Sequence, residues 1–163
     1  MLKPNHIFKN ITDITAEFLA SNGIKSLLLD VDNTLAVYGT KEPVHGIIDW
    51  IETMQNAGVS LKILSNARKK RISIFAAKLN LPYYALSFKP LPFRIRSGVK
   101  KMGYKKSETA MIGDQIFTDI LGANLSGIIS ILVKPIQFET GFSYKFKRWL
   151  ERKMLKKDSE IWE

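Results

Sequence analysis

Cysteine is absent from this 163-residue chain, and histidine occurs only twice. Without cysteine there is no disulfide, no thiolate zinc site and no cysteine nucleophile. The two histidines, His6 and His45, stand in no motif with a second catalytic or metal-binding residue. We therefore expect surface or packing roles for both.

Long apolar runs are also missing. No run approaches the roughly 18 residues that a membrane-spanning helix needs. Residues 1–10 are interrupted by Pro4 and carry Lys3 and Lys9, so they lack the apolar segment of a secretory signal. These absences predict a soluble cytoplasmic protein, with peripheral attachment at the inner face of the membrane as the alternative.

Acidic residues are outnumbered by basic ones. The chain holds 25 lysines and arginines against 15 aspartates and glutamates, which gives a net charge of +10. Residues 89–163 carry most of the excess, with 15 basic and 8 acidic side chains. A basic surface favours anionic partners. Nucleic acid, an acidic lipid surface and a phosphorylated substrate all fit this composition.

The order of apolar and amphipathic segments predicts one α/β domain over residues 1–163. Strands that alternate with amphipathic helices are typical of a parallel sheet covered by helices. The expected strands are Ser26–Leu29, Val59–Leu64, Tyr83–Leu86, Thr109–Ile112 and Ile128–Val133. The expected helices, with apolar residues at three- and four-residue spacing, are Thr12–Ala20, Val44–Asn56, Arg68–Leu79, Pro92–Met102, Ile116–Asn124 and Ser143–Lys157.

Two carboxylates directly follow the first of these strands. The run Leu27-Leu28-Leu29 continues into Asp30-Val31-Asp32-Asn33-Thr34. Ionised carboxylates are costly to cluster beside a core unless a cation neutralises them or one of them keeps a proton. The pattern therefore predicts a site for a hard divalent metal ion.

Polar side chains follow the other central strands as well. Ligands of open α/β sheets bind at the carboxyl ends of the strands, so we expect these side chains to meet Asp30 and Asp32 at one edge of the sheet. The residues concerned are Ser65, Asn66, Lys89, Asp114 and Asp119.

These segments carry a resemblance to a known family. Asp-Val-Asp-Asn-Thr from Asp30, then Ser65, Lys89 and Gly-Asp-Gln-Ile-Phe-Thr-Asp from Gly113, resemble in order and context the four motifs of the haloacid dehalogenase (HAD) superfamily. The resemblance implies an HAD-like Rossmannoid three-layer sandwich with a mostly parallel five-stranded sheet. It also implies a Mg²⁺-dependent phosphatase that works through an aspartyl-phosphate.

The same resemblance implies a role for each matching residue. Asp30 would attack phosphorus, and Asp32 would protonate the leaving oxygen and then deprotonate the attacking water. Ser65 and Lys89 would neutralise the phosphoryl oxygens, and Thr34 would fix the loop and could also donate a hydrogen bond to the phosphate. The implied Mg²⁺ ligands are Asp30, the backbone carbonyl of Asp32 and Asp114, with Asp119 bound to the metal or to its waters.

Structural roles are open for some of these residues. Asp32 and Asp119 can cap a turn or a helix, Ser65 can cap the helix that follows it, and Lys89 can be a solvated surface charge. Taken together, such roles would leave the convergence at the strand ends unexplained.

Substrate contacts are expected from residues that follow the second and third motifs. Asn66 comes directly after Ser65, and Arg94 and Arg96 belong to a helix that begins near the expected site. A solvated helix face is the alternative for the two arginines.

The spacing of the motifs leaves no room for a cap domain. Thirty residues separate Thr34 from Ser65 and 23 separate Ser65 from Lys89, and a helix and a strand already occupy each gap. A capless site favours a phosphate on a protein, nucleic acid or membrane lipid. The capless arrangement and the first and fourth motifs resemble the YqeG-type phosphatases of HAD subfamily IIIA, a group similar to phosphatidylglycerophosphate phosphatases.

Residues 142–157 are expected to form a basic amphipathic helix. Such a helix can lie on an anionic leaflet, or its apolar stripe can pack on the domain. The apolar side comprises Phe142, Phe146, Trp149, Leu150, Met154 and Leu155. The basic residues are Lys145, Arg148, Arg152, Lys153, Lys156 and Lys157.

Three functions are compatible with these features. The first is hydrolysis of a phosphate monoester on a bulky substrate such as phosphatidylglycerophosphate. The second is dephosphorylation of a nucleic-acid end or a phosphoprotein, which the open site and the basic charge also allow. The third is a ribosome-associated binding factor with incidental catalysis, although the complete set of motif residues argues against it.

Overall fold

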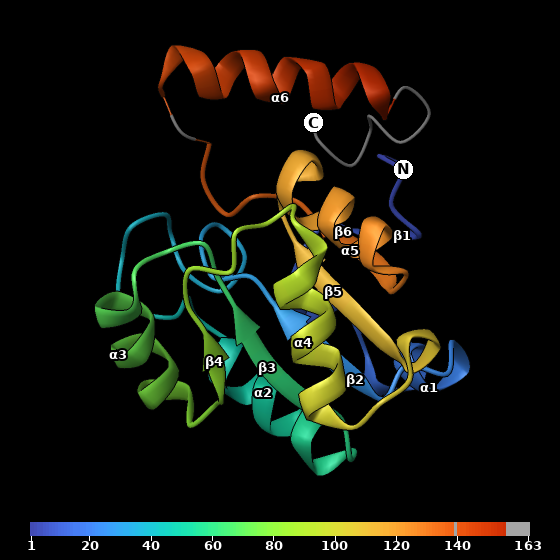
Figure 1. The fold of residues 1–163 in the computed structure, drawn as a ribbon. Helices are drawn as coiled ribbons and strands as arrows, with labels where there is room; N and C mark the ends of the chain where they lie inside the picture. Colours follow the sequence, from blue (N-terminus) through green and yellow to red (C-terminus); the bar gives the residue numbers. More distant parts are fainter. Residues whose placement is uncertain (139, 156–163) are drawn as a thin grey trace.

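The computed structural model describes residues 1–138 and 140–155, which form a parallel sheet with helices on both faces (Figure 1). The strands are β1 (His6–Phe8), β2 (Ser26–Leu29), β3 (Ser60–Leu64), β4 (Tyr83–Tyr84), β5 (Thr109–Gly113) and β6 (Ile129–Val133). The helices are α1 (Ala16–Ser21), α2 (Ile47–Asn56), α3 (Lys69–Leu79), α4 (Pro92–Met102), α5 (Leu121–Ser126) and α6 (Phe142–Met154). The sheet order is β1-β6-β5-β2-β3-β4, and each neighbouring pair is parallel.

Alternating side chains of the central strands divide the core into two layers. In β2, Leu27 and Leu29 belong to the cluster that contains the buried residues of α1, α2 and α3. Leu28 belongs to a second cluster with residues of α4 and α5. Because successive strand residues face opposite sides of a sheet, this division confirms the expected α/β sandwich.

The expected five-stranded sheet is corrected to six strands. β1 has only three residues, between Pro4 and Lys9, and it pairs at the sheet edge with β6, where His6 lies opposite Ile131. A strand this short carries no readable alternation of apolar and polar residues. Its pairing with a strand more than 100 residues away was therefore not predictable from the local sequence.

Two expected helices are each divided into two shorter elements. The leading helix is divided into a 3₁₀ turn, Ile11–Asp13, and α1, with Thr15 accepting a hydrogen bond from the Phe18 amide. The segment expected as Ile116–Asn124 is a π-helical turn, Ile116–Ile120, followed by α5. π-helical turns occur often at functional sites, and this one carries Asp119.

The sheet register brings the carboxyl ends of three central strands level. Leu29, the last residue of β2, lies opposite Ile63 of β3 and Ile112 of β5. Figure 1 shows α6 lying across the end of the molecule where these strands finish. Within the described residues, no helix is both long enough and apolar enough to cross a membrane.

Candidate active site

Asp30 is held at the carboxyl end of β2 by the sheet itself. Its amide donates a hydrogen bond to the Ile112 carbonyl over 3.0 Å, which continues the β2–β5 ladder by one residue. The chain then turns sharply at Asn33, whose φ of 57° is in the left-handed region that asparagine tolerates better than most residues. The Asp30 carboxyl is consequently fixed and buried at the edge of the core.

Lys89 lies between two carboxylates. Its ammonium group is 2.6 Å from Asp30 Oδ1 and 2.8 Å from Asp119 Oδ1, and it donates to the Leu64 carbonyl over 3.0 Å. All three side chains are buried. Burial opposes the lysine charge, but the two carboxylates outweigh it and raise the Lys89 pKa above its ordinary value. Lys89 is therefore a fixed cation beside the candidate nucleophile, not a solvated surface charge.

Asn66 determines where Lys89 lies. Its side-chain oxygen accepts hydrogen bonds from the Lys89 amide at 2.8 Å and from the Ser87 hydroxyl at 2.7 Å, while its nitrogen donates to the Lys89 carbonyl. Asn66 also lines the site cavity. The residue expected to contact substrate is thus engaged in holding the loop that carries the lysine.

Asp32 is paired with an arginine that the motifs did not indicate. The two terminal nitrogens of Arg71 contact the two oxygens of Asp32, at 2.5 and 2.9 Å, in a bidentate pair. Arg71 also donates to the Thr40 carbonyl, and the Gly39 amide donates to Asp32. One arginine therefore fixes both the candidate acid–base residue and the loop beside it.

Asp114 is fully buried and contacts α6. Its carboxylate is ion-paired with Arg148, which also donates to the Asp114 carbonyl over 2.5 Å. Glu151 holds the same guanidinium at 2.8 Å and accepts a hydrogen bond from the Ile116 amide at 3.0 Å. Burial raises the pKa of Asp114, although Arg148 opposes this effect.

Asp119 approaches the backbone at Gly113. A Cβ atom at residue 113 would overlap the Asp119 carboxyl group, so only glycine fits there. The Asp119 carboxyl accepts a hydrogen bond from the Gln115 amide at 3.1 Å, which closes the π-helical turn. This close approach explains sterically why glycine, and no larger residue, precedes Asp114 at the end of β5.

The carboxylates suit a hard divalent cation. Asp30, Asp114 and Asp119 each offer an oxygen within 4.8 Å of the others, and Asp114 Oδ1 is buried without a hydrogen-bond partner. Burial and the nearby Asp119 charge raise the Asp30 pKa to about 7, despite Lys89. Mg²⁺ prefers such a sparse set of oxygen ligands. The Asp32 carboxylate lies outside this group, which is compatible with a contribution through its backbone carbonyl.

The site opens into a cavity of about 310 Å³. Ser65 is buried at its wall, where its hydroxyl accepts a hydrogen bond from the Ala67 amide at 3.1 Å. Thr34 is buried with its hydroxyl unpartnered, but it does not line this cavity. The cavity is lined by Asp30, Asp32, Tyr38, Ser65, Asn66, Ala67, Arg71, Lys89, Gln115, Thr118 and Asp119.

The two arginines of α4 lie apart from this cavity. Arg96 donates to the Leu125 carbonyl over 2.7 Å and thereby links α4 to α5. Arg94 is exposed in the first turn of α4. Neither side chain lines the cavity, where Arg71 supplies the guanidinium instead.

Sequence reasoning missed Arg71, Arg148 and Tyr38 as site residues. Arg71 is the last of four consecutive basic residues, and nothing in that run marks which one faces the site. Arg148 did have a signal, because Glu151 is an acidic residue at i+3 in a basic helix. That spacing predicts an ion pair between the two residues, but not its burial against the site.

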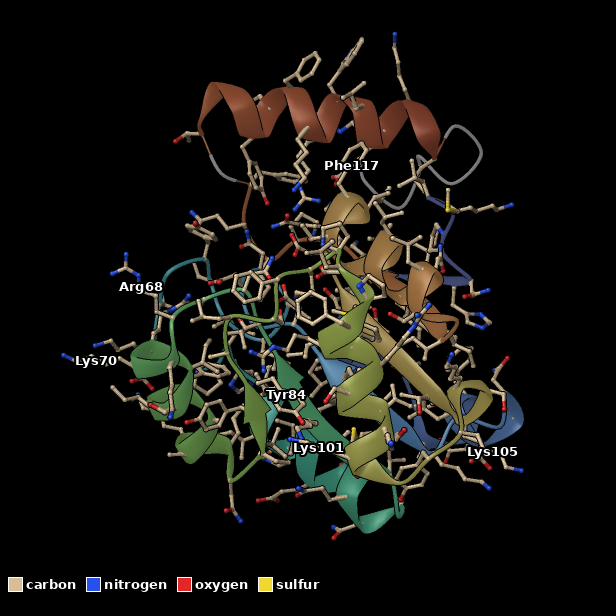
Figure 2. The ribbon with its side chains drawn as sticks, in the orientation of Figure 1. Arg68, Lys70, Tyr84, Lys101, Lys105 and Phe117 are labelled. Carbon is tan, nitrogen blue, oxygen red and sulfur yellow. The ribbon has the colours of Figure 1, made fainter. Side chains whose placement is uncertain are left out.

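Helix α6 turns Arg148, and not the aromatic rings of its expected apolar side that the structure describes, toward the domain. Arg148 and Leu155 are buried, whereas Phe146 and Trp149 are exposed and stack on each other with ring centroids 5.8 Å apart. Phe117, from the π-helical turn, lies beneath this helix (Figure 2). The helix thus packs through a charged contact and leaves two aromatic rings outward; Lys156 and Lys157 lie outside the described residues.

Comparisons with known proteins bear on the family of this chain. Residues 88–135 match the HAD-hydrolase-like family model, and residues 1–78 match the model of mitochondrial PGP phosphatase. The probable phosphatase YqeG of Bacillus subtilis is 35% identical over 93% of this chain and 88% of its own. Phosphatidylglycerophosphate phosphatase 1 of Arabidopsis thaliana is 26% identical, and this chain spans only 47% of its length.

Solved structures resemble the fold. An uncharacterized protein from Listeria monocytogenes has a TM-score of 0.59 and 20% identity, covering 72% of this chain and 85% of its own. The D,D-heptose 1,7-bisphosphate phosphatase of B. bronchiseptica, complexed with magnesium and phosphate, has a TM-score of 0.57 and 14% identity, covering 67% and 80%. At these identities the likeness concerns the fold alone.

Proposed function

This chain belongs to the YqeG family of HAD-like phosphatases, and we propose that it is a Mg²⁺-dependent phosphate monoester hydrolase for a bulky substrate such as phosphatidylglycerophosphate. The observation that carries the chemistry is the cluster of Asp30, Asp114 and Asp119 at the carboxyl edge of the sheet, with Lys89 paired to Asp30 and Asp119. Carboxylates gathered there fit a metal-assisted phosphoryl transfer.

The proposed reaction uses Asp30 as nucleophile and Asp32 as acid and base. An Asp30 oxygen bonds to phosphorus while the bond to the leaving oxygen breaks, and Asp32 gives that oxygen a proton. Water then attacks the aspartyl-phosphate, Asp32 takes a proton from it, and the bond between Asp30 and phosphorus breaks to release phosphate.

The other residues have electrostatic roles in this proposal. Lys89 and Ser65 are placed to compensate charge on the phosphoryl oxygens. Asp30, Asp114 and the Asp32 carbonyl would hold Mg²⁺, with Asp119 beside it. Bound Mg²⁺ would supply a Lewis acid for the phosphoryl group. Arg71 would keep Asp32 in position.

The open cavity and a relative's name support the substrate. None of the elements that line the cavity is a separate cap, since Tyr38 belongs to the segment between β2 and α2 and Asn66 to the loop between β3 and α3. A phosphate on a large molecule therefore fits better than one that must be enclosed. The Arabidopsis relative is a phosphatidylglycerophosphate phosphatase by name, which supports a lipid substrate.

The test is Mg²⁺-dependent phosphate release from phosphatidylglycerophosphate in mixed micelles, with p-nitrophenyl phosphate as the soluble comparison. Asp30→Asn should lower turnover of either compound about a thousandfold or more, because it removes the nucleophile. Asp49→Asn, an exposed aspartate of α2, is the matched control and should leave turnover unchanged.

The outcomes separate mechanism from substrate. Turnover that favours the lipid and disappears in Asp30→Asn supports both. Turnover of p-nitrophenyl phosphate alone keeps the mechanism and rejects the lipid substrate. No Mg²⁺-dependent turnover of either compound contradicts the enzymatic proposal and favours a binding factor.

A further inference from the structure

The loop between β4 and α4, together with the first turn of α4, exposes large apolar side chains beside the site. Four of them are between 44% and 53% exposed. The Phe88 and Phe93 rings lie 6.4 Å apart, and the Leu91 amide donates to the Phe88 carbonyl at 2.9 Å, so the group is contiguous. We call this group the apolar rim, and it consists of Leu86, Phe88, Leu91 and Phe93.

The backbone of this loop is held in a conformation that turns the rim outward. Leu86 and Phe88 have φ values of 48° and 55°, in a region that bulky residues avoid. Ser87 and Lys89, which alternate with them, are buried. The outward rim and the inward lysine are therefore two sides of one strained segment.

Hydrogen bonds to the loop after β3 fix that conformation. The Leu86 amide donates to the Ala67 carbonyl and the Ser87 amide to the Ser65 carbonyl, each at 3.0 Å. Asn66 holds Ser87 and Lys89. Contiguous exposed apolar groups on a rigid element are typical of interaction sites, and strained residues cluster where function requires them.

The surroundings of the rim are cationic. Between Glu52 and Glu108 the sequence has no acidic residue at all. Arg68 and Lys70 project outward from the start of α3, which follows directly on Ala67 (Figure 2). The exposed basic side chains at the starts of α3 and α4 are Arg68, Lys69, Lys70, Arg94 and Arg96.

We propose that the apolar rim inserts into the interface of an anionic lipid bilayer, with the neighbouring arginines and lysines on the headgroups. Aromatic and aliphatic side chains bordered by cations match the two layers of such an interface, apolar below and anionic above. A second copy of this chain would bring cations against cations, which disfavours self-association through this face.

This inference deepens the proposed function. Only the lipid substrate rests on the proposed function, whereas membrane binding by the apolar rim does not depend on it. Lys89 belongs to the rim segment and contacts Asp30 at 2.6 Å. Insertion of the rim would therefore place the nucleophile at the depth where lipid phosphates lie.

The test compares flotation with vesicles of phosphatidylcholine, alone or with a third of it replaced by phosphatidylglycerol. The full-length protein should float with the anionic vesicles, and added salt should weaken the binding. The double variant Leu91→Ser/Phe93→Ser should lower the partition coefficient by about tenfold or more, because two large apolar groups no longer leave water.

The matched control carries the same change elsewhere. Ile48→Ser/Ile74→Ser alters two exposed apolar residues of α2 and α3, and its partition coefficient should stay within about twofold of wild type. The rim variant should still hydrolyse p-nitrophenyl phosphate, since Lys89 and Asn66 are intact, and this activity verifies that it is folded.

Several results would overturn the inference. One is equal binding of the rim variant and wild type. A second is equal binding to charged and uncharged vesicles. A third is loss of vesicle binding in Phe146→Ser/Trp149→Ser but not in the rim variant, which would assign membrane binding to α6. The vesicles contain no phosphate monoester, so flotation measures membrane binding without catalysis. If the protein binds these vesicles but does not hydrolyse phosphatidylglycerophosphate in mixed micelles, the proposed substrate is contradicted and the membrane-binding role of the apolar rim is retained.

Discussion

Helices α3 and α6 are both rich in basic residues, and each turns one arginine toward a carboxylate of the site. In α3 it is Arg71, which pairs with Asp32, and in α6 it is Arg148, which pairs with Asp114. The surroundings of the two pairs differ. The side chains of the first pair are 20% and 16% exposed, whereas those of the second are 7% and 0% exposed.

This difference separates a positioning contact from a structural one. Water screens a partly exposed ion pair, so its loss costs little stability. A buried pair contributes little net stability when intact, but removing one partner leaves an uncompensated charge inside the protein. The α3 arginine should therefore matter mainly for turnover, and the α6 arginine mainly for folding.

The largest expected effect is that of Arg148→Met. The change leaves Asp114 and Glu151 buried without their cation, so the free energy of unfolding in urea should fall by about 3–5 kcal/mol in metal-free buffer. Lys145→Met, at an exposed position of the same helix, should change it by less than about 0.5 kcal/mol. Similar values for both variants would mean that α6 does not depend on this pair.

The pH dependence of stability tests the carboxylate cluster directly. Burial and Asp119 raise the Asp30 pKa to about 7 in the folded protein. The unfolded chain therefore releases this proton first, and stability falls as pH rises from the ordinary carboxyl range toward 7. Asparagine does not titrate. Asp30→Asn should hence be more stable than wild type at pH 8 without metal, by about 1 kcal/mol or more.

Thermal unfolding in EDTA across pH 5 to 8 measures this difference, with Asp49→Asn as the control. The gain from Asp30→Asn should grow with pH and level off above about pH 7, where the wild-type proton is lost. Added Mg²⁺ should reverse the order, because a ligand of the folded state stabilises it. A gain that shrinks with rising pH would contradict the raised pKa.

The carboxylates of the site and Lys89 were predictable from sequence, but Arg71 and Arg148 were not. Asp30 and Asp114 each follow an apolar run, and parallel strands bring their carboxyl ends to one edge whatever the details of packing. α3 begins within one residue of its predicted start, but nothing in four consecutive basic residues marks Arg71 as the one that faces Asp32. Arg148 reaches the site only because α6 folds back across it, which no local pattern encodes.

The helices and strands also differ in whether a local sequence pattern predicts them. α4 begins and ends where its apolar spacing and its flanking residues predicted, at Pro92 and before Gly103. β1 went unrecognised because its three residues become a strand only through pairing with β6. Elements determined by their own sequence were predictable, whereas those determined by a distant partner were not.

The smallest expected effect on stability, and the most direct test of the comparison, is that of Arg71→Met. The free energy of unfolding should change by less than about 1 kcal/mol, since the pair with Asp32 is partly exposed. Turnover should nevertheless fall about tenfold, because Asp32 loses the group that orients it.

Two further variants show whether geometry or charge is responsible. Arg71→Lys keeps the charge but cannot form the bidentate contact, so its kcat should stay low. Lys70→Met, exposed beside it, should leave kcat for the soluble p-nitrophenyl phosphate unchanged. Full turnover in Arg71→Lys would assign the effect to charge alone. A loss of stability in Arg71→Met as large as that in Arg148→Met would mean that exposure is not what distinguishes the two arginines.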